Sequence, residues 1–136
     1  QKNLELIPEI VEGNYFISAN PNRFRQVIVN LVENAIKYTI TGSVRIRTKT
    51  SDVKNIYTIE IKDTGLGISA EGQKRLFEKF YRVRTEKNAS IPGTGLGLWI
   101  VKQIVEKMSG EIGVESMEGA GTKFTIAFPL LIEKGK

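Results

Sequence analysis

Amide and cationic side chains gather on one face of a predicted helix. Asn30, Asn34 and Lys37 are four and three residues apart, so at about 100° per residue they fall within roughly 40° of one another. Asparagine suits a helix interior poorly because its amide competes with the backbone for hydrogen bonds. Its oxygen can ligate Mg²⁺, and a lysine one turn on can attract phosphate. The stripe predicts either a solvated polar edge, extended by Arg23 and Gln26, or a metal-phosphate site.

A carboxylate followed by two glycines ends an apolar strand at residues 63–68, DTGLGI. This pattern is compatible with a tight turn that the aspartate side chain caps. It is also compatible with a binding site, in which Asp63 accepts a hydrogen bond from an exocyclic amine. Gly65 and Gly67 would then let a flat ring approach the backbone, since glycine lacks a Cβ atom. Such an acceptor would distinguish adenine from guanine.

A second glycine-rich run, GTGLGL at residues 93–98, opens a predicted helix. Backbone amides at a helix N-terminus can face an anion, with the positive end of the helix dipole behind them. The run therefore predicts a phosphate cradle, although a glycine-rich helix entry can also serve packing alone. Its spacing is not GxGxxG, no GK[ST] follows, and HRD and DFG motifs are absent. These differences exclude the Rossmann, P-loop and HRD/DFG protein kinase classes.

Composition excludes several further classes of protein. The 136 residues include neither His nor Cys, which rules out disulfides, thiolate or imidazole metal sites and the Ser-His-Asp triad. The length favours a single domain over residues 1–136, and the net charge is +5. Arg45, Arg47 and Lys49 alternate with less polar residues, which indicates the solvated face of a strand rather than a nucleic-acid site. No signal peptide or membrane span is visible, so we expect a cytoplasmic domain without membrane contact.

The elements that must position these motifs follow from periodicity and punctuation. Asn20-Pro21 should open a helix that ends near Thr39, and Ser69, with Gln73 nearby, should open a shorter one. A third helix should span residues 96–108 and end at Gly110. Strands are predicted near residues 4–7, 43–50, 56–62, 111–117 and 122–128. This order predicts an α+β fold, a two-layer sandwich with three helices on one face of a mixed, mainly antiparallel sheet.

Five sequence boxes in order make the chain resemble the ATP-binding catalytic domain of two-component sensor histidine kinases. RQVIVNLVENAIKYT at 25–39 is similar to the N box, DTGLGI to the G1 box and FEKFYRV at 77–83 to the F box. GTGLGL is similar to the G2 box, and GAGT at 119–122 to the final glycine box. The resemblance covers essentially the whole chain. It implies the Bergerat-type sandwich that these kinases share with gyrase, Hsp90 and MutL, with ATP and Mg²⁺ as cofactors.

The resemblance also implies roles for single residues at the nucleotide site. Asn34 would ligate Mg²⁺ with Asn30 in support, and Tyr38 would lie against the base or ribose. Asp63 would bind the adenine amine. Lys37 and Arg82 would be the catalytic cations on the phosphates. The other nucleotide-site residues would be Gly65, Gly67, Ile68, Tyr81, Gly93, Thr94, Gly95, Leu96, Gly97, Leu98 and Thr122, and residues 83–95 would form the ATP lid.

Two differences from the pattern of the family and its relatives refine the expected activity. Because this sequence has no His, the phosphoacceptor would lie on a separate helical domain, and a response regulator would receive the phosphoryl group afterwards. Related ATPases carry a water-activating Glu at the position of Asn30, so its absence favours a histidine kinase over an ATPase. We expect a monomeric isolated domain and a homodimeric parent. The rivals are a serine kinase of the anti-sigma type and a pure nucleotide- or nucleic-acid-binding module.

The single tryptophan is left unassigned by the resemblance. Trp99 shares a helix stripe with Lys102, Gln103 and Glu106, so we expect it on the polar side. The ring could cover the stem of Lys102 or Gln103, or lie beneath a loop such as the lid. Alternatively, it could form part of the surface that docks the histidine-bearing hairpin, because interface anchors are enriched in Trp.

Overall fold

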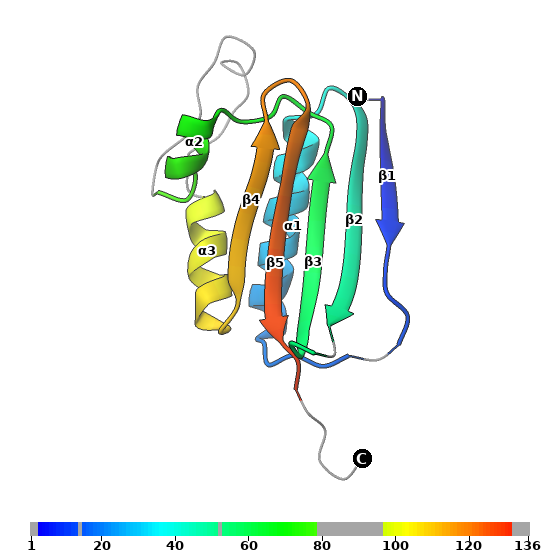
Figure 1. Cartoon of the computed structure of the whole chain (residues 1–136), viewed down its shortest axis with the longest axis vertical. Coiled ribbons are helices and arrows are strands. Elements are labelled where there is room, and N and C mark those ends of the chain that lie inside the picture. The colour runs from blue at the N-terminus through cyan, green and yellow to red at the C-terminus, as the bar shows by residue number, and fades with distance from the viewer. Residues whose placement is uncertain (1–2, 14, 52, 79–96, 132–136) are drawn as a thin grey trace.

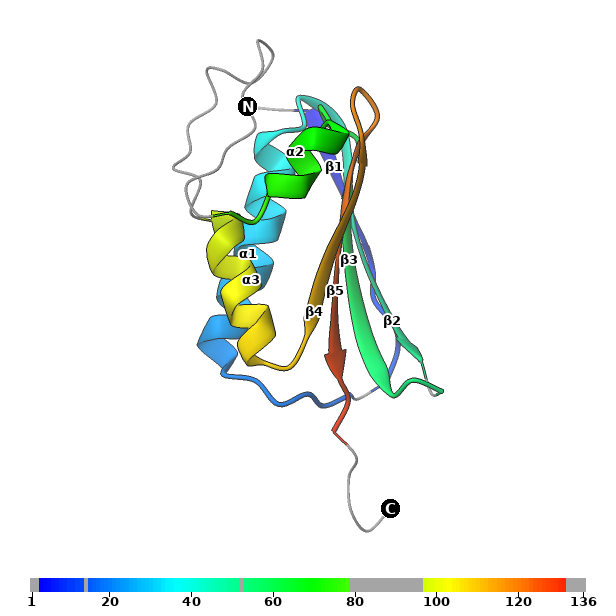
Figure 2. The same ribbon diagram turned by 60° about the vertical axis from the view of Figure 1, so that its left-hand side comes forward.

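The fold is a two-layer sandwich, seen in a computed structural model that describes residues 3–13, 15–51, 53–78 and 97–131 (Figure 1). The helices of this described part are α1 (Pro21–Lys37), α2 (Ala70–Arg75) and α3 (Gly97–Lys107). Turned by 60°, the molecule shows them on one face of the sheet (Figure 2). The predicted α+β sandwich is therefore confirmed.

Five strands form one mixed sheet in the order β1-β2-β3-β5-β4. β1 (Asn3–Glu9) runs parallel to β2 (Thr41–Ser51), whereas all other neighbours are antiparallel. These others are β3 (Ile56–Asp63), β4 (Glu111–Met117) and β5 (Gly121–Pro129). Two parallel neighbours need a crossover connection, and α1 provides it between β1 and β2. The mainly antiparallel sheet matches the expectation.

Helix α1 begins where its sequence predicts. The Asn20 side-chain oxygen accepts hydrogen bonds from the backbone N–H of Asn22 at 2.9 Å and Arg23 at 3.2 Å, with Pro21 as the first helical residue. This cap satisfies N–H groups that no helical carbonyl can reach. The helix ends at Lys37, two residues before the expected end at Thr39. Its buried face then packs on the sheet through Val27, Leu31 and Ala35.

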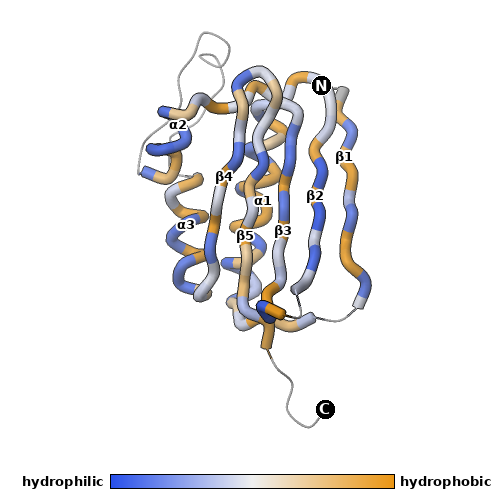
Figure 3. The backbone as a smooth tube through the Cα atoms, viewed as in Figure 1, coloured by the Kyte–Doolittle hydropathy of each residue, from blue (hydrophilic) through white to orange (hydrophobic). Residues whose placement is uncertain are grey.

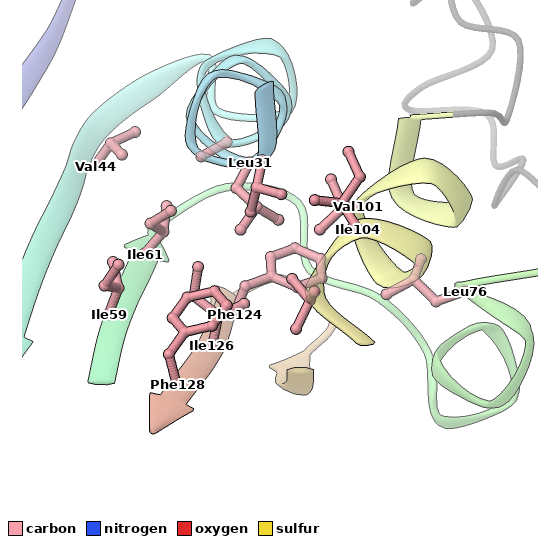
Figure 4. Packing of buried hydrophobic residues seen from close by; sticks show 13 residues of the cluster. Leu31, Val44, Ile59, Ile61, Leu76, Val101, Ile104, Phe124, Ile126 and Phe128 are labelled. Atoms are coloured by element: carbon pink, nitrogen blue, oxygen red, sulfur yellow. The ribbon is translucent and has the colours of Figure 1, made fainter. Parts of the chain in front are cut away.

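The core lies between the helices and the inner face of the sheet (Figure 4). Leu31 from α1 and Val101 from α3 point toward Phe124 and Ile126 of β5 in this view. Hydrophobic and hydrophilic residues alternate along β2 and β4, as the period of two in a half-buried strand requires (Figure 3). The outer face is polar: Arg47 contacts Glu9 at 3.2 Å, which agrees with the solvated face expected for this strand.

The end of α3 differs in detail from the prediction. Gly110 was the expected terminator, but the residue with a left-handed backbone is Ser109, with φ 60°. The N–H of Gly110 then bonds the Val105 carbonyl at 2.9 Å and closes the helix. A Cβ atom at Gly110 would stand 2.7 Å from a ring atom of Phe128. Glycine is required here for close approach to the core rather than for its dihedral angles.

Candidate nucleotide-binding site

Asp63 is the last residue of β3, the central strand of the sheet. Its side chain is buried, with 4% of the residue exposed. Oδ1 accepts hydrogen bonds from the backbone N–H of Gly65 at 2.9 Å and of Thr122 at 3.2 Å. Within the described residues, Oδ2 accepts no hydrogen bond from the protein. The carboxylate is thus held in a fixed plane with one oxygen left to bind a donor.

Burial dominates the electrostatics of this carboxylate. Loss of hydration raises the pKa of Asp63, while the hydrogen bonds from Gly65 and Thr122 lower the pKa without cancelling that effect. A buried anion with one unpaired oxygen is unfavourable for the empty protein. The Gly65 bond is the turn cap that the sequence allows, and the unpaired oxygen is also compatible with a binding role.

The loop after Asp63 packs too tightly against α1 for any side chain at Gly65. A Cβ atom there would overlap the Tyr38 carbonyl oxygen and stand 2.7 Å from Thr39 Oγ1. The N–H of Leu66 donates to the same Tyr38 carbonyl at 3.1 Å, which fixes the loop to the end of α1. Gly67, with φ 74°, faces the turn after β4 in the same way. The loop that contains these glycines therefore packs against the end of α1 on one side and the end of β4 on the other.

A hydrogen-bond network that the sequence patterns missed joins this loop to the β4–β5 hairpin. The Gln73 amide on α2 donates to the Ile68 carbonyl at 2.9 Å and to the Ser116 carbonyl at 3.0 Å. The Ser116 hydroxyl accepts from the Ile68 N–H at 2.8 Å and contacts Thr122 Oγ1 at 2.8 Å. Ser116 and Thr122 face each other across the hairpin. Only that strand register, and no local motif, could have revealed their pairing.

The polar stripe on α1 lies on a partly exposed face of the helix. Asn30 and Asn34 are both of intermediate exposure, and so is Lys37. Across the described ranges, neither asparagine side chain has a hydrogen-bond partner in the protein. Amides of intermediate exposure can hydrogen-bond water, and a metal ion or a phosphate oxygen can replace that water. The pair is consistent with ligands for a metal ion and its phosphates.

The described residues contain no group of three or more His, Cys, Asp or Glu side chains that could hold a metal ion. A carboxylate-rich cage is therefore not present in this part of the chain. Mg²⁺ commonly takes only one or two protein ligands and completes its shell with water and phosphate oxygens. The amide oxygen of Asn34 fits that smaller requirement.

The remaining predicted residues divide into two groups. Thr122 is buried, Tyr38, Ile68 and Leu98 are half-buried, and Gly97 is exposed at the start of α3. Of these, Ile68 and Leu98 also pack against the core. The other group lies outside the described residues: Tyr81, Arg82, Gly93, Thr94, Gly95, Leu96 and the proposed lid at 83–95.

Trp99 is half-buried, although its helix stripe predicts an exposed ring. It lines a cavity of about 810 Å³ between α1 and α3, together with Arg23 and Gln103. The Lys102 ammonium lies instead over the Phe77 ring, 5.6 Å from its centre. The expectation that Trp99 lies on the polar, exposed side of its helix is therefore only partly met.

Comparison with known proteins identifies the family to which this fold belongs. Residues 19–132 match the family described as histidine kinase-, DNA gyrase B-, and HSP90-like ATPase. The chain belongs to this family. The sensor protein GacS of Pseudomonas syringae pv. syringae is 38% identical over 133 residues, which cover 95% of this chain and 15% of GacS.

Solved structures of histidine kinases share the whole sandwich. Full-length ShkA in complex with AMPPNP gives a TM-score of 0.81 at 28% identity, over 96% of this chain and 26% of ShkA. The nucleotide-free catalytic domain of histidine kinase ThkA gives 0.77 at 29% identity, over 93% of this chain and 79% of that domain. Within its family, the chain is thus an ATP-binding catalytic domain of the sensor histidine kinase type.

The chain spans less than a third of the length of the curated sensor kinases that it matches. Those kinases therefore contain much more than this domain. Among the residues that the structure describes, no helix is both long and apolar enough to cross a membrane.

Proposed function

We propose that this domain binds Mg²⁺-ATP and donates the γ-phosphoryl group to a histidine on a separate helical domain. The observation that carries the proposal is the buried Asp63 carboxylate, whose Oδ1 is fixed by two backbone amides. Its other oxygen is suited to accept a hydrogen bond from the exocyclic amine of adenine. Membership of the histidine kinase family supports ATP as the nucleotide. The sensor kinases among the relatives support histidine as the acceptor.

At the base end, each proposed residue acts through shape or hydrogen bonding. Gly65 and Gly67 would act through the loop's shape, because they let it pack against the ends of α1 and β4, where no side chain fits. Ile68 would contribute apolar surface, and Thr122 would lie near the base because its backbone already holds Asp63. Tyr38, at the end of α1, would lie against the base or ribose.

At the phosphate end, α1 would supply the metal ligand and a charge. Asn34 would ligate Mg²⁺, Asn30 would support it, and Lys37 would reach the phosphates. The absence of competing protein partners for the two amides, within the described residues, fits this assignment. Mg²⁺, when bound, neutralises charge on the phosphate oxygens, which is the main requirement of phosphoryl transfer.

Residues outside the described part of the chain would complete the site. Arg82 would face the γ-phosphate and stabilise the charge that spreads during transfer. The amides of residues 93–98 would cradle the phosphates, with Gly97 and Leu98 continuing into α3. Tyr81 and the proposed lid at 83–95 would close over the nucleotide. This domain would thus contribute positioning and charge neutralisation, and the accepting imidazole would come from its partner.

The proposed partners are the phosphoacceptor helical domain, within a homodimeric parent, and a response regulator that takes the phosphoryl group next. Trp99 offers a probe for the first of these. If it contacts the histidine-bearing hairpin, its emission should shift to the blue when the hairpin is added. Emission that is already blue and unchanged by the hairpin would reject that contact.

A phosphotransfer assay tests the proposal directly. The chain is incubated with labelled ATP, Mg²⁺ and a purified helical hairpin bearing the phosphoacceptor histidine, and acid-labile phosphate is measured on the hairpin. Transfer to histidine is the expected result. Transfer to serine on an anti-sigma antagonist substrate would support the rival kinase, and ATP binding without transfer to either would leave a nucleotide-binding module.

A further inference from the structure

One side chain on α2, Gln73, hydrogen-bonds both the loop after β3 and strand β4, the two segments next to Asp63 and Thr122. Nε2 of Gln73 carries two hydrogens, and both are used: one on the Ile68 carbonyl at 2.9 Å and one on the Ser116 carbonyl at 3.0 Å. Ile68 belongs to the loop after Asp63, and Ser116 belongs to β4. Gln73 therefore links the loop that shapes the base site to the hairpin that forms its wall.

The hydroxyl of Ser116 has a defined direction. It accepts from the Ile68 N–H at 2.8 Å, and it lies 2.8 Å from both the Gly121 carbonyl and Thr122 Oγ1. A hydroxyl has a single proton, and a carbonyl can only accept. The Ser116 proton is therefore given to Gly121, so the contact with Thr122 requires Thr122 to donate.

This direction decides what Thr122 can offer a ligand. With its own proton directed to Ser116, Thr122 Oγ1 has only lone pairs left to present. Thr122 is paired with Asp63 across β5 and β3, and its N–H holds the Asp63 carboxylate at 3.2 Å. A base that lies against Asp63 would therefore meet a second acceptor at the paired position of the neighbouring strand. An amino group satisfies such a pair, whereas a carbonyl oxygen in the same place would be repelled.

We propose that Gln73 and Ser116 are positioning residues that set the preference of this site for a 6-aminopurine over a 6-oxopurine nucleotide. The inference rests on the proposed nucleotide function, because it assumes that the base lies against Asp63. Gln73 fixes the Ser116 backbone and the Ile68 carbonyl, and Ser116 fixes the proton of Thr122. Neither residue needs to touch the nucleotide.

The test compares ATP with inosine triphosphate, whose base carries a carbonyl at the position of the adenine amine. Affinities of both nucleotides are measured by titration calorimetry with the full chain and Mg²⁺. In Gln73→Met and Ser116→Ala, ATP affinity should fall about tenfold while inosine triphosphate changes less than threefold. The preference for ATP should therefore fall at least threefold. Ser116→Thr keeps the hydroxyl and should retain the wild-type preference.

Ser69→Ala is the matched control on the same short helix. Ser69 caps α2 by accepting the Gly72 N–H at 3.0 Å, but it has no part in the network. Its removal loosens α2, so it should lower the unfolding temperature and leave the ATP preference unchanged. If loosening α2 reproduces the loss of preference, Gln73 acts only by holding the helix, and the positioning role is wrong.

The outcomes separate this inference from the function on which it rests. A wild-type chain that prefers ATP, with an unchanged preference in Gln73→Met, overturns the positioning roles and leaves the base assignment intact. A wild-type chain that binds the two nucleotides equally overturns both. Thermal unfolding of each variant shows whether it is folded, and Gln73→Met decides the case if Ser116→Ala fails to fold, because it removes no volume from the hairpin.

Discussion

The two ends of the proposed nucleotide site are built in opposite ways. At the base end, Asp63, Ser116 and Gln73 are each held by two or more hydrogen bonds to the backbone or to neighbouring side chains. At the phosphate end, the amides of Asn30 and Asn34 lie half-buried and, among the described residues, have no partner. We call the base end the completed end because hydrogen bonds within the protein fix its groups, although one oxygen of Asp63 stays unpaired. We call the phosphate end the open end because a ligand would have to supply the partners of its amides.

The chemistry of the proposed ligand explains this difference. A purine is flat and largely uncharged, so its recognition depends on donors and acceptors whose directions are fixed before binding. A triphosphate with its metal ion is highly charged and strongly hydrated. Its protein ligands must replace water, and a preformed partner on Asn34 would compete with the ion. The contrast between a completed end and an open end can be tested one residue at a time.

The largest effect should come from the open end. Asn34→Ala removes the proposed metal ligand, so Mg²⁺ should no longer strengthen nucleotide binding. Phosphotransfer should fall by roughly two orders of magnitude or more, since metal charge stabilisation is worth several kcal/mol. Glu33→Gln is the matched control, because Glu33 is the exposed neighbour on the same helix. A Mg²⁺ titration of Asn34→Ala that matches the wild type would place the ion elsewhere.

The completed end should give a smaller, base-specific loss. Asp63→Asn should weaken ATP binding at least tenfold, about 1.4 kcal/mol, because an amide nitrogen replaces the oxygen that would accept from the base. The fold should survive, since the amide oxygen can still accept from Gly65 and Thr122. Glu60→Gln makes the same chemical change on the outer face of the same strand and should leave ATP affinity unaltered. Equal binding of ATP and GTP by the wild type would contradict the role of Asp63.

The sequence predicted the open end more fully than the completed end. The i, i+4 spacing of Asn30 and Asn34 on a capped helix was sufficient to place both amides on one face. Asp63 could likewise be found from its position between an apolar strand and two glycines. These signals are local, because each lies within a few residues of the chain.

The network behind Asp63 could not be found in this way. Gln73 pairs with Ser116 across 43 residues, and its nearness to Ser69 suggested only a role at the start of α2. Ser116 meets Thr122 only because β4 and β5 pair in one register. The same limit applies to Trp99, whose helix stripe predicted exposure although the residue is half-buried beside a cavity that a residue of α1 also lines. Contacts of this kind depend on how elements pack, which periodicity does not specify.

A further test at the phosphate end uses Gly97, at the start of α3. No atom lies within 4 Å of a Cβ atom built there, and its φ is not positive. Gly97→Ala should therefore leave stability unchanged or raise it by up to about 1 kcal/mol, since alanine favours helix. If the amides of GTGLGL cradle phosphate, ATP affinity should still fall about threefold to tenfold. Near-normal affinity in both this variant and Gly95→Ala would make the run a packing feature.

The smallest effects concern stability, and they compare two carboxylates on β3. Burial raises the pKa of Asp63, whereas the hydrogen bond from Lys49, at 2.9 Å, lowers the pKa of Glu60 despite its burial. For Asp63, the folded state binds the proton more tightly than the unfolded state. Its contribution is fully present below about pH 4 and is lost as the pH rises through the folded pKa. Glu60 contributes above its ordinary pKa of about 4.3, and that contribution is lost as the pH falls through the lowered value.

Urea unfolding between pH 3 and pH 8 should therefore show opposite changes in the free energy of unfolding for Asp63→Asn and Glu60→Gln. Asp63→Asn should gain stability relative to the wild type as the pH rises, because it removes an anion that the empty site leaves half-satisfied. Glu60→Gln should lose up to about 1 kcal/mol at neutral pH, a modest loss because Lys49 is more than half exposed, and the loss should vanish near pH 3. If Asp63→Asn instead destabilised the chain most at pH 8, the carboxylate would be part of the scaffold. The completed end would then be built for stability, and its fit to a base would be incidental.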